Sequence, residues 1–152
     1  MGAPRRLSLA LALAIALACL SSLARADSAG ELVALINDYR GKPPTCDGRR
    51  LPMAAPLAPS ELLARVTPAD PSQLGAALRA GSYPVANATS IRVTGLADAA
   101  AVLRFVAERH CVDLLDPRYS QIGVSRSVGN TWLITLAKPL LPGDLGGWRR
   151  AG

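Results

Sequence analysis

The sequence of 152 residues is poor in the side chains that most often carry metal binding and acid–base catalysis. It contains one histidine, His110, and three cysteines, and aromatic residues make up 4% of the chain. A metal centre normally needs three or four converging nitrogen, oxygen or sulfur ligands, so a centre built on several histidines is excluded. Basic residues are scattered or paired, as in Arg49-Arg50 and Arg149-Arg150, without a long basic run or many aromatic rings to stack on bases. These absences argue against nucleic-acid binding and favour a solvated surface.

The N-terminus has the features of an export signal. Arg5 and Arg6 form a basic start, and the apolar run from Leu7 to Leu20 is too short and too rich in alanine for a stable transmembrane helix. Ala24-Arg25-Ala26 then places small residues at the two positions that a signal peptidase reads, which predicts cleavage after Ala26. We therefore expect residues 1–26 to be a Sec-type signal peptide and the mature protein to be periplasmic or secreted.

Removal of this signal changes the charge and defines the domain. The three arginines in it, Arg5, Arg6 and Arg25, account for half of the formal charge of +6, so the mature chain carries +3. The remaining residues suffice for one domain with a single core. We expect this domain over residues 27–141, followed by a flexible tail over residues 142–152, with no transmembrane span.

The cysteines divide between the signal and the domain. Cys19 follows Ala16-Leu17-Ala18, which leaves lipid attachment as an alternative, but the usual leucine three places before the cysteine is absent and the better cleavage site lies downstream. The mature chain then holds Cys46 and Cys111. An even number in an oxidising compartment favours a disulfide over two free thiols. That bond would close a loop of about 65 residues and contribute roughly 4 kcal/mol.

Apolar spacing and capping residues predict four helices. Ser28 and Glu31 fit a capping box, and Leu32 and Ile36 follow on one apolar face. Gly41, ahead of two prolines, ends this first helix after Arg40. The expected helices are residues 29–40, 60–66, 71–80 with Asp70 as N-cap and Gly81 past the end, and 99–109 with Asp98 as N-cap.

Strands are expected mainly in the second half of the chain. Alternating apolar and polar residues predict a strand over residues 90–94, and two further strands over 121–127 and 131–137 are joined by Val128-Gly129-Asn130, where positive φ is expected. The proline-rich residues 43–59 are expected to form an ordered surface loop, held by Cys46. This order of elements indicates an α+β domain.

Two stretches carry short motifs of one known family, in that family's order. The first is Leu35-Ile36-Asn37-Asp38-Tyr39-Arg40, then Cys46-Asp47-Gly48-Arg49-Arg50 and the proline-rich segment from Pro52 to Pro59. The second is His110-Cys111, Leu114-Leu115-Asp116-Pro117-Arg118-Tyr119, Ile122-Gly123-Val124 and Trp132. The chain thereby resembles bacterial secreted SCP-like domains of the CAP superfamily, which is named for cysteine-rich secretory proteins, antigen 5 and pathogenesis-related 1 proteins.

The resemblance implies an α-β-α sandwich with a central antiparallel sheet and a disulfide between Cys46 and Cys111. It also implies a cleft in which two histidines and acidic residues hold a divalent metal. The chain departs from that pattern, because the first cleft histidine, expected within residues 64–78, is absent and Thr89 stands at the acidic position of the family's Gly-Glu-Asn-Ile segment. The cleft candidates are therefore His110, Thr89 and Ser90.

No complete catalytic or metal-binding set follows from these candidates. Asp113 and Asp116 lie close enough in sequence to join His110, but Asp116 more simply caps or turns the chain before Pro117. A triad of Ser125, His110 and Asp113 stays open as an alternative, but a serine within a strand is more often structural. A Cys111 nucleophile would be consumed by the disulfide. We assign no catalytic residue, no metal and no cofactor.

Two classes of function remain open. The first is an exported, non-catalytic module that binds a lipid, a cell-wall fragment or another envelope protein. The second is an envelope hydrolase that uses His110 with an unidentified partner residue. Loss of one cleft histidine and of the acidic position favours the binding module. The pattern contains no heptads and no signal for a defined oligomer.

Overall fold

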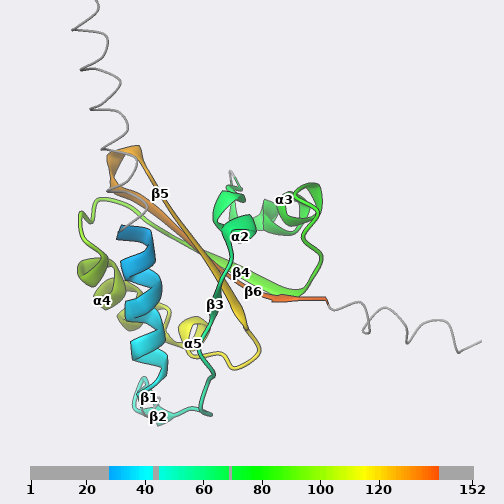
Figure 1. Ribbon diagram of the computed structural model, residues 1–152. Helices are drawn as coiled ribbons and strands as arrows, with labels where there is room; N and C mark the ends of the chain where they lie inside the picture. The colour runs from blue at the N-terminus through cyan, green and yellow to red at the C-terminus, as the bar shows by residue number, and fades with distance from the viewer. Residues whose placement is uncertain (1–27, 43–44, 69, 141–152) are drawn as a thin grey trace, which may run out of the picture.

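The computed structural model describes residues 28–42, 45–68 and 70–140, which form a sheet between two layers of helices (Figure 1). The sheet has the strand order β3-β5-β6-β4. One layer contains the first helix, residues 28–40, with α4 (Ala99–Arg109) and α5 (Cys111–Leu114). The other contains α2 (Glu61–Arg65) and α3 (Leu74–Ala80). The α+β class and the α-β-α sandwich are therefore confirmed.

The strands are β3 (Ala58–Pro59), β4 (Val85–Val93), β5 (Gln121–Ser127) and β6 (Thr131–Pro139). β6 pairs antiparallel with both β4 and β5, whereas the short β3 pairs parallel with β5. The sheet is thus antiparallel except at that edge, where a purely antiparallel sheet was expected. Gly129 and Asn130 between β5 and β6 have φ values of 72° and 52°, which confirms the predicted turn.

Strand β4 begins five residues earlier than the predicted strand over residues 90–94. Its first half contains alanine and asparagine, which have weak intrinsic strand propensity. That half is nevertheless extended because it pairs with β6, in a register that runs from Val85 opposite Pro139 to Val93 opposite Trp132. Pairing with a buried central strand therefore overrides the local preference of the sequence.

The predicted N-caps Asp70 and Asp98 are confirmed, because each accepts a hydrogen bond from a backbone N–H of the following turn. Ser60, expected as the first residue of a helix, is instead the N-cap of α2 and accepts from the N–H of Leu63. The first turn after Asp70 is a 3-10 turn, η1 (Pro71–Gln73), which leads into α3. The short helix α5 was not predicted, because its four residues are too few to show helical periodicity.

The pleat of the sheet divides the core into two parts. Alternate residues such as Ile91, Ile122 and Trp132 pack against the layer of the first helix and α4. On the other face, Ala137 packs with apolar residues of α2 and α3. Gly123 lies on this second face, where a Cβ atom would overlap the backbone of α2, so α2 approaches the sheet directly over a glycine.

Two polar side chains of the first helix hold the loop that follows it. Arg40 is fully buried and donates from Nε and Nη2 to the carbonyl of Ala55, at 2.9 and 2.7 Å, and from Nη1 to the carbonyl of Leu114 at 2.5 Å. The amide of Asn37 donates to the carbonyl of Leu57 and accepts from its N–H, at 3.0 and 2.8 Å. The predicted ordered loop is thus held by hydrogen bonds between these side chains and its backbone, which stand in for the backbone partners that a strand would have.

The disulfide between Cys46 and Cys111 is present, with a Cα–Cα distance of 5.7 Å. Cys46 belongs to β1 (Thr45–Cys46), which forms a small hairpin with β2 (Arg49–Arg50) within the segment expected to be a loop. Its turn residues Asp47 and Gly48 have φ values of 51° and 73°. The bond joins this hairpin to the start of α5 and confirms the predicted pairing.

The predicted signal peptide, residues 1–26, the domain end at residue 141 and the tail over residues 142–152 lie outside the described residues. Within residues 28–42, 45–68 and 70–140, no helix has the length and apolar character needed to cross a bilayer.

Candidate functional site

The candidates Thr89 and Ser90 lie next to each other on β4, but their side chains belong to opposite faces of the sheet. Thr89 pairs with Leu136, whose side chain packs on the face covered by the first helix and α4. Ser90 pairs with Thr135, on the face covered by α2 and α3. Adjacent residues of a strand necessarily diverge in this way. Both are half-buried, and they meet the same groove from different sides of the strand.

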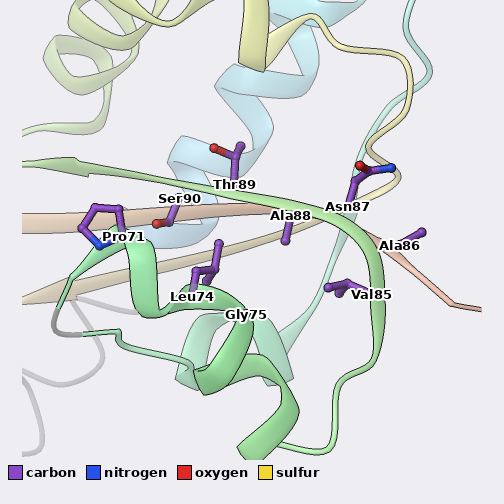
Figure 2. Close-up of a pocket in the computed structure, with 9 residues that line it drawn as sticks. All are labelled: Pro71, Leu74, Gly75, Val85, Ala86, Asn87, Ala88, Thr89 and Ser90. Carbon is purple, nitrogen blue, oxygen red and sulfur yellow. The ribbon is translucent and has the colours of Figure 1, made fainter.

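This groove has a volume of about 280 Å³ and lies between β4 and the start of α3 (Figure 2). We call it the β4 groove, and its lining residues are Pro71, Leu74, Gly75, Val85, Ala86, Asn87, Ala88, Thr89 and Ser90. In Figure 2, Leu74 points from α3 toward the strand, while Thr89 and Ala88 point to opposite sides of it. The cavity contacts six consecutive residues of β4 and therefore follows the length of this strand beside η1 and α3.

The lining of the β4 groove is uncharged. Asn87, Thr89 and Ser90 provide an amide and two hydroxyl groups, and the other six lining residues are apolar or glycine. None of these groups is an acid or base at neutral pH. The groove can therefore form neutral hydrogen bonds and apolar contacts, but it offers no group for proton transfer.

His110 lies elsewhere, at the junction of α4 and α5. Its N–H donates to the carbonyl of Val106 at 2.8 Å, and its carbonyl accepts from the N–H of Leu114 at 3.0 Å. Its Nδ1 lies 3.6 Å from Oδ2 of Asp113, with both side chains about 40% exposed. His110 is not among the residues that line the β4 groove, so the three candidates do not form one lining.

The residues present do not fit the divalent metal that the resemblance implies. Among the described residues, one group of three metal-ligating side chains comes together, namely Cys46, Asp47 and Cys111. Its two sulfur atoms are bonded to each other and provide no thiolate. His110 is outside this group, and within the part of the chain that the structure describes its one carboxylate partner is Asp113, which is fewer ligands than a metal centre requires.

The alternative serine triad is not assembled. Ser125 on β5 pairs with Leu133, two residues from Gly123, and shares its face of the sheet. His110 and Asp113 belong to the opposite layer, with α4 and α5. The sheet therefore separates this serine from the imidazole, and that triad is wrong.

Two other concavities lie beside α2. The larger, about 400 Å³, is between α2 and α3 and has mostly apolar walls, including the exposed Leu62. The other, about 280 Å³, is between α2 and the start of the first helix, next to Ile122 and Val124. Neither contains His110, Thr89 or Ser90.

Sequence reasoning missed the part of the groove before Thr89 and its α3 wall. A usable signal was present in the run from Val85 to Ile91, which has seven uncharged residues without proline. Edge strands normally carry charges or proline that prevent further pairing, so such a run at an edge leaves a strand with which another chain can pair. Its position at the edge became known only from the sheet order.

Two solved bacterial structures have a similar arrangement of helices and strands. One is an extracellular protein containing an SCP domain from Bacillus anthracis, with a TM-score of 0.60 and 18% identity over 75% of this chain. The other is a cysteine-rich secretory protein from Staphylococcus aureus, with a TM-score of 0.61 and 12% identity over 75% of this chain. The described residues of this chain share the fold of these two proteins, one of which contains an SCP domain.

This likeness confirms, at the level of the fold, the resemblance expected from the motifs. The chain covers 41% and 39% of the two similar proteins, so it spans less than half the length of either. No protein-family model and no curated protein sequence matches the chain. The SCP fold places the motif residues Arg40, Cys46 and Cys111 in structural contacts rather than in the β4 groove.

Proposed function

We propose that this protein is an exported, non-catalytic binding module that holds a ligand of the cell envelope in the β4 groove. The envelope ligand is a lipid, a cell-wall fragment or a segment of another envelope protein. The export signal expected over residues 1–26 supports the location. The extracellular and secretory descriptions of the two structurally similar proteins agree with it.

The observation that carries this proposal is the chemistry of the groove. Its polar groups are the amide of Asn87 and the hydroxyls of Thr89 and Ser90, beside apolar contacts such as Leu74. Such a surface recognises uncharged polar groups and supplies no nucleophile activated by a base. Because His110 does not line this groove, the hydrolase alternative has no assembled set of reactive groups within the described residues.

The neutral lining also favours some envelope ligands over others. A lipid chain would gain more from the mostly apolar concavity between α2 and α3 than from the β4 groove. A cell-wall fragment or an extended polypeptide carries the amide and hydroxyl groups that Asn87, Thr89 and Ser90 can bind. We therefore expect the ligand to be polar and uncharged where it contacts β4.

Native mass spectrometry of the protein purified from its own envelope fraction tests this proposal. A retained adduct, absent from the denatured protein, is the expected result, and its mass identifies the ligand class. Asn87→Lys places a charge on an exposed position of the groove and is expected to remove the adduct. Val112→Lys introduces the same charge at an exposed position of α5 and is the matched control. A bare chain from the envelope, or an adduct equally retained by Asn87→Lys, would contradict the proposal.

The same samples test export and catalysis. An intact mass that begins at Asp27 is expected for the exported chain. His110→Ala is expected to leave the adduct and its mass unchanged. Loss of a measurable hydrolysis of envelope peptides or lipids in His110→Ala, at unchanged melting temperature, would instead support the hydrolase.

A further inference from the structure

We propose that the β4 groove binds an extended, uncharged peptide that adds to the sheet as a strand beside β4. This inference rests on the proposed function and names the chemical class of its ligand. It begins from the sheet order, in which β4 is a terminal strand of nine residues. The other terminal strand, β3, has two residues. Within the described residues, β6 is the only strand paired with β4.

An edge strand presents hydrogen-bonding groups that require a partner. In an antiparallel pair, the N–H and C=O groups of alternate residues point away from the neighbouring strand. On β4 these groups lie on the edge opposite β6, and the groove contacts every residue of that strand from Val85 to Ser90. A peptide backbone supplies matching N–H and C=O groups at the same spacing, which neither a lipid chain nor a glycan does.

From Val85 to Ile91 the side chains of the strand lack the charges and proline that keep edges unpaired, and its one register shift lies near its start, between Val85 and Asn87. Lysine, proline and inward-pointing charges normally serve this purpose. The residues from Val85 to Ile91 have none of them, and the first charged residue is Arg92. The Arg92 side chain donates to the carbonyl of Pro68 at 2.7 Å. A guest strand along residues 85–90 therefore meets no charge on β4.

The wall of the groove favours a single peptide over a second copy of the chain. Pro71, Leu74 and Gly75 stand beside the same length of β4 that a guest would cover (Figure 2). Two β4 strands paired antiparallel are related by a two-fold axis perpendicular to the sheet, so both walls would lie on one face and compete for the same space. An extended peptide carries no helix of its own beside the strand, so it can occupy the groove without this steric conflict.

The groove dimensions set the expected ligand. Six strand residues span about 20 Å, which matches a peptide of about six residues. Small neighbours such as Ala88 and Gly75 leave room for modest side chains on the α3 side. The expected ligand is thus an extended peptide of about six residues, uncharged, with small or β-branched side chains.

Binding of the hexapeptide acetyl-Thr-Ala-Val-Ala-Thr-Ala-amide to the leader-free oxidised protein tests the inference. Calorimetry gives its affinity, and amide hydrogen exchange is expected to slow at residues 85–90. Two N-methylated versions of the peptide form the decisive pair. Methyl groups on alternate amides that face β4 should abolish binding, whereas methyl groups on the other set should leave it unchanged. Equal affinity of the two methylated peptides would refute strand addition.

Ala86→Pro blocks the edge with little effect on the sheet. Ala86 is exposed and lies at the register shift between Val85 and Asn87, where it has no paired residue on β6. Proline there removes an N–H and should weaken peptide binding by about three- to tenfold. Asn87→Lys tests the same edge if Ala86→Pro does not fold, with Val112→Lys as the control that should bind normally.

The remaining outcomes separate this inference from the function on which it rests. An adduct that is a glycan or lipid, lost in Asn87→Lys, without peptide binding at millimolar concentration would refute the peptide and keep the binding module. If amide hydrogen exchange at residues 85–90 slows with rising protein concentration in the absence of peptide, the occupant is a second copy of the chain. That result would also refute the peptide proposal. A bare chain that binds no peptide would overturn both proposals.

Discussion

Replacement of Arg40 by methionine should destabilise the protein strongly without touching the β4 groove. The guanidinium is fully buried and holds two well-formed acceptors, the carbonyls of Ala55 and Leu114, with longer contacts to the carbonyls of Asp116 and Tyr119 at 3.3 and 3.5 Å. It therefore joins three chain segments that are far apart in sequence. Burial lowers the pKa of this guanidinium, and the nearby Asp116 carboxylate opposes that shift.

The size of the effect follows from the groups left without partners. Hydrogen bonds from a charged donor contribute about 1.5 to 3 kcal/mol each, and burial of the guanidinium offsets part of this gain. Loss of the three short hydrogen bonds to these two carbonyls should therefore lower the free energy of unfolding by about 3 kcal/mol after that offset. For a domain of this size, this corresponds to a decrease in melting temperature of roughly 10 °C. Methionine retains the apolar stem, so the loss reports on the guanidinium.

Denaturant unfolding of Arg40→Met, Arg40→Lys and Arg104→Met checks this reasoning. Lysine keeps the charge but cannot reproduce the forked contacts, so Arg40→Lys should lose nearly as much stability as Arg40→Met. Arg104 is exposed on α4, and its replacement should change the free energy by less than about 0.5 kcal/mol. A loss below about 1 kcal/mol for Arg40→Met would refute the structural role of this network.

Three further outcomes follow from the structure. Replacing both Cys46 and Cys111 by alanine should lower the free energy of unfolding by about 4 kcal/mol, measured by denaturant titration, because the bond closes a loop of 65 residues; an unchanged midpoint would contradict this. Thr135→Val should raise the melting temperature, since the buried Oγ1 has no hydrogen-bond partner among the described residues, and a decrease would indicate a partner. The hydrogen bond from Arg118 lowers the pKa of the Asp116 carboxyl below its ordinary value of 3.8. The ionised carboxylate therefore stabilises the folded protein fully above pH 3.8, and this contribution is lost as the pH falls through the pKa of the folded state. Asp116→Asn should reduce the loss of stability on acidification, and an unchanged pH profile of unfolding would contradict the assignment.

Much of the fold could be predicted because its helices carry local signals. Asp70 and Asp98 are N-caps in the structure as expected, and the turn at Gly129 and Asn130 has the predicted positive φ. These features depend on neighbours within four residues, which the sequence displays directly. The first half of β4 lacks such a signal, because its extended conformation depends on β6, more than forty residues away.

The candidate site could be predicted only in part, for a geometric reason. Alignment to a family motif gives positions along the chain but not the side of the sheet on which each residue lies. Thr89 and Ser90 were grouped with His110 as one cleft, whereas the pleat sends the two β4 side chains to opposite faces and only those two line the groove. The edge position of β4, which gives the groove its chemistry, requires the order of all four strands.

The residues that carry the resemblance explain why the fold persists while the implied metal cleft does not. Asn37 and Arg40 hold the loop after the first helix, and Cys46 and Cys111 tie that loop to α5. Each of these contacts stabilises the frame around the sheet and requires neither a second histidine nor an acidic cleft residue. Within the described residues, the frame therefore keeps β4 at the edge of the sheet with β6 as its one paired strand, independently of any chemistry at His110. The proposed strand addition uses the backbone edge of β4, so peptide binding should tolerate His110→Ala but not a blocked β4.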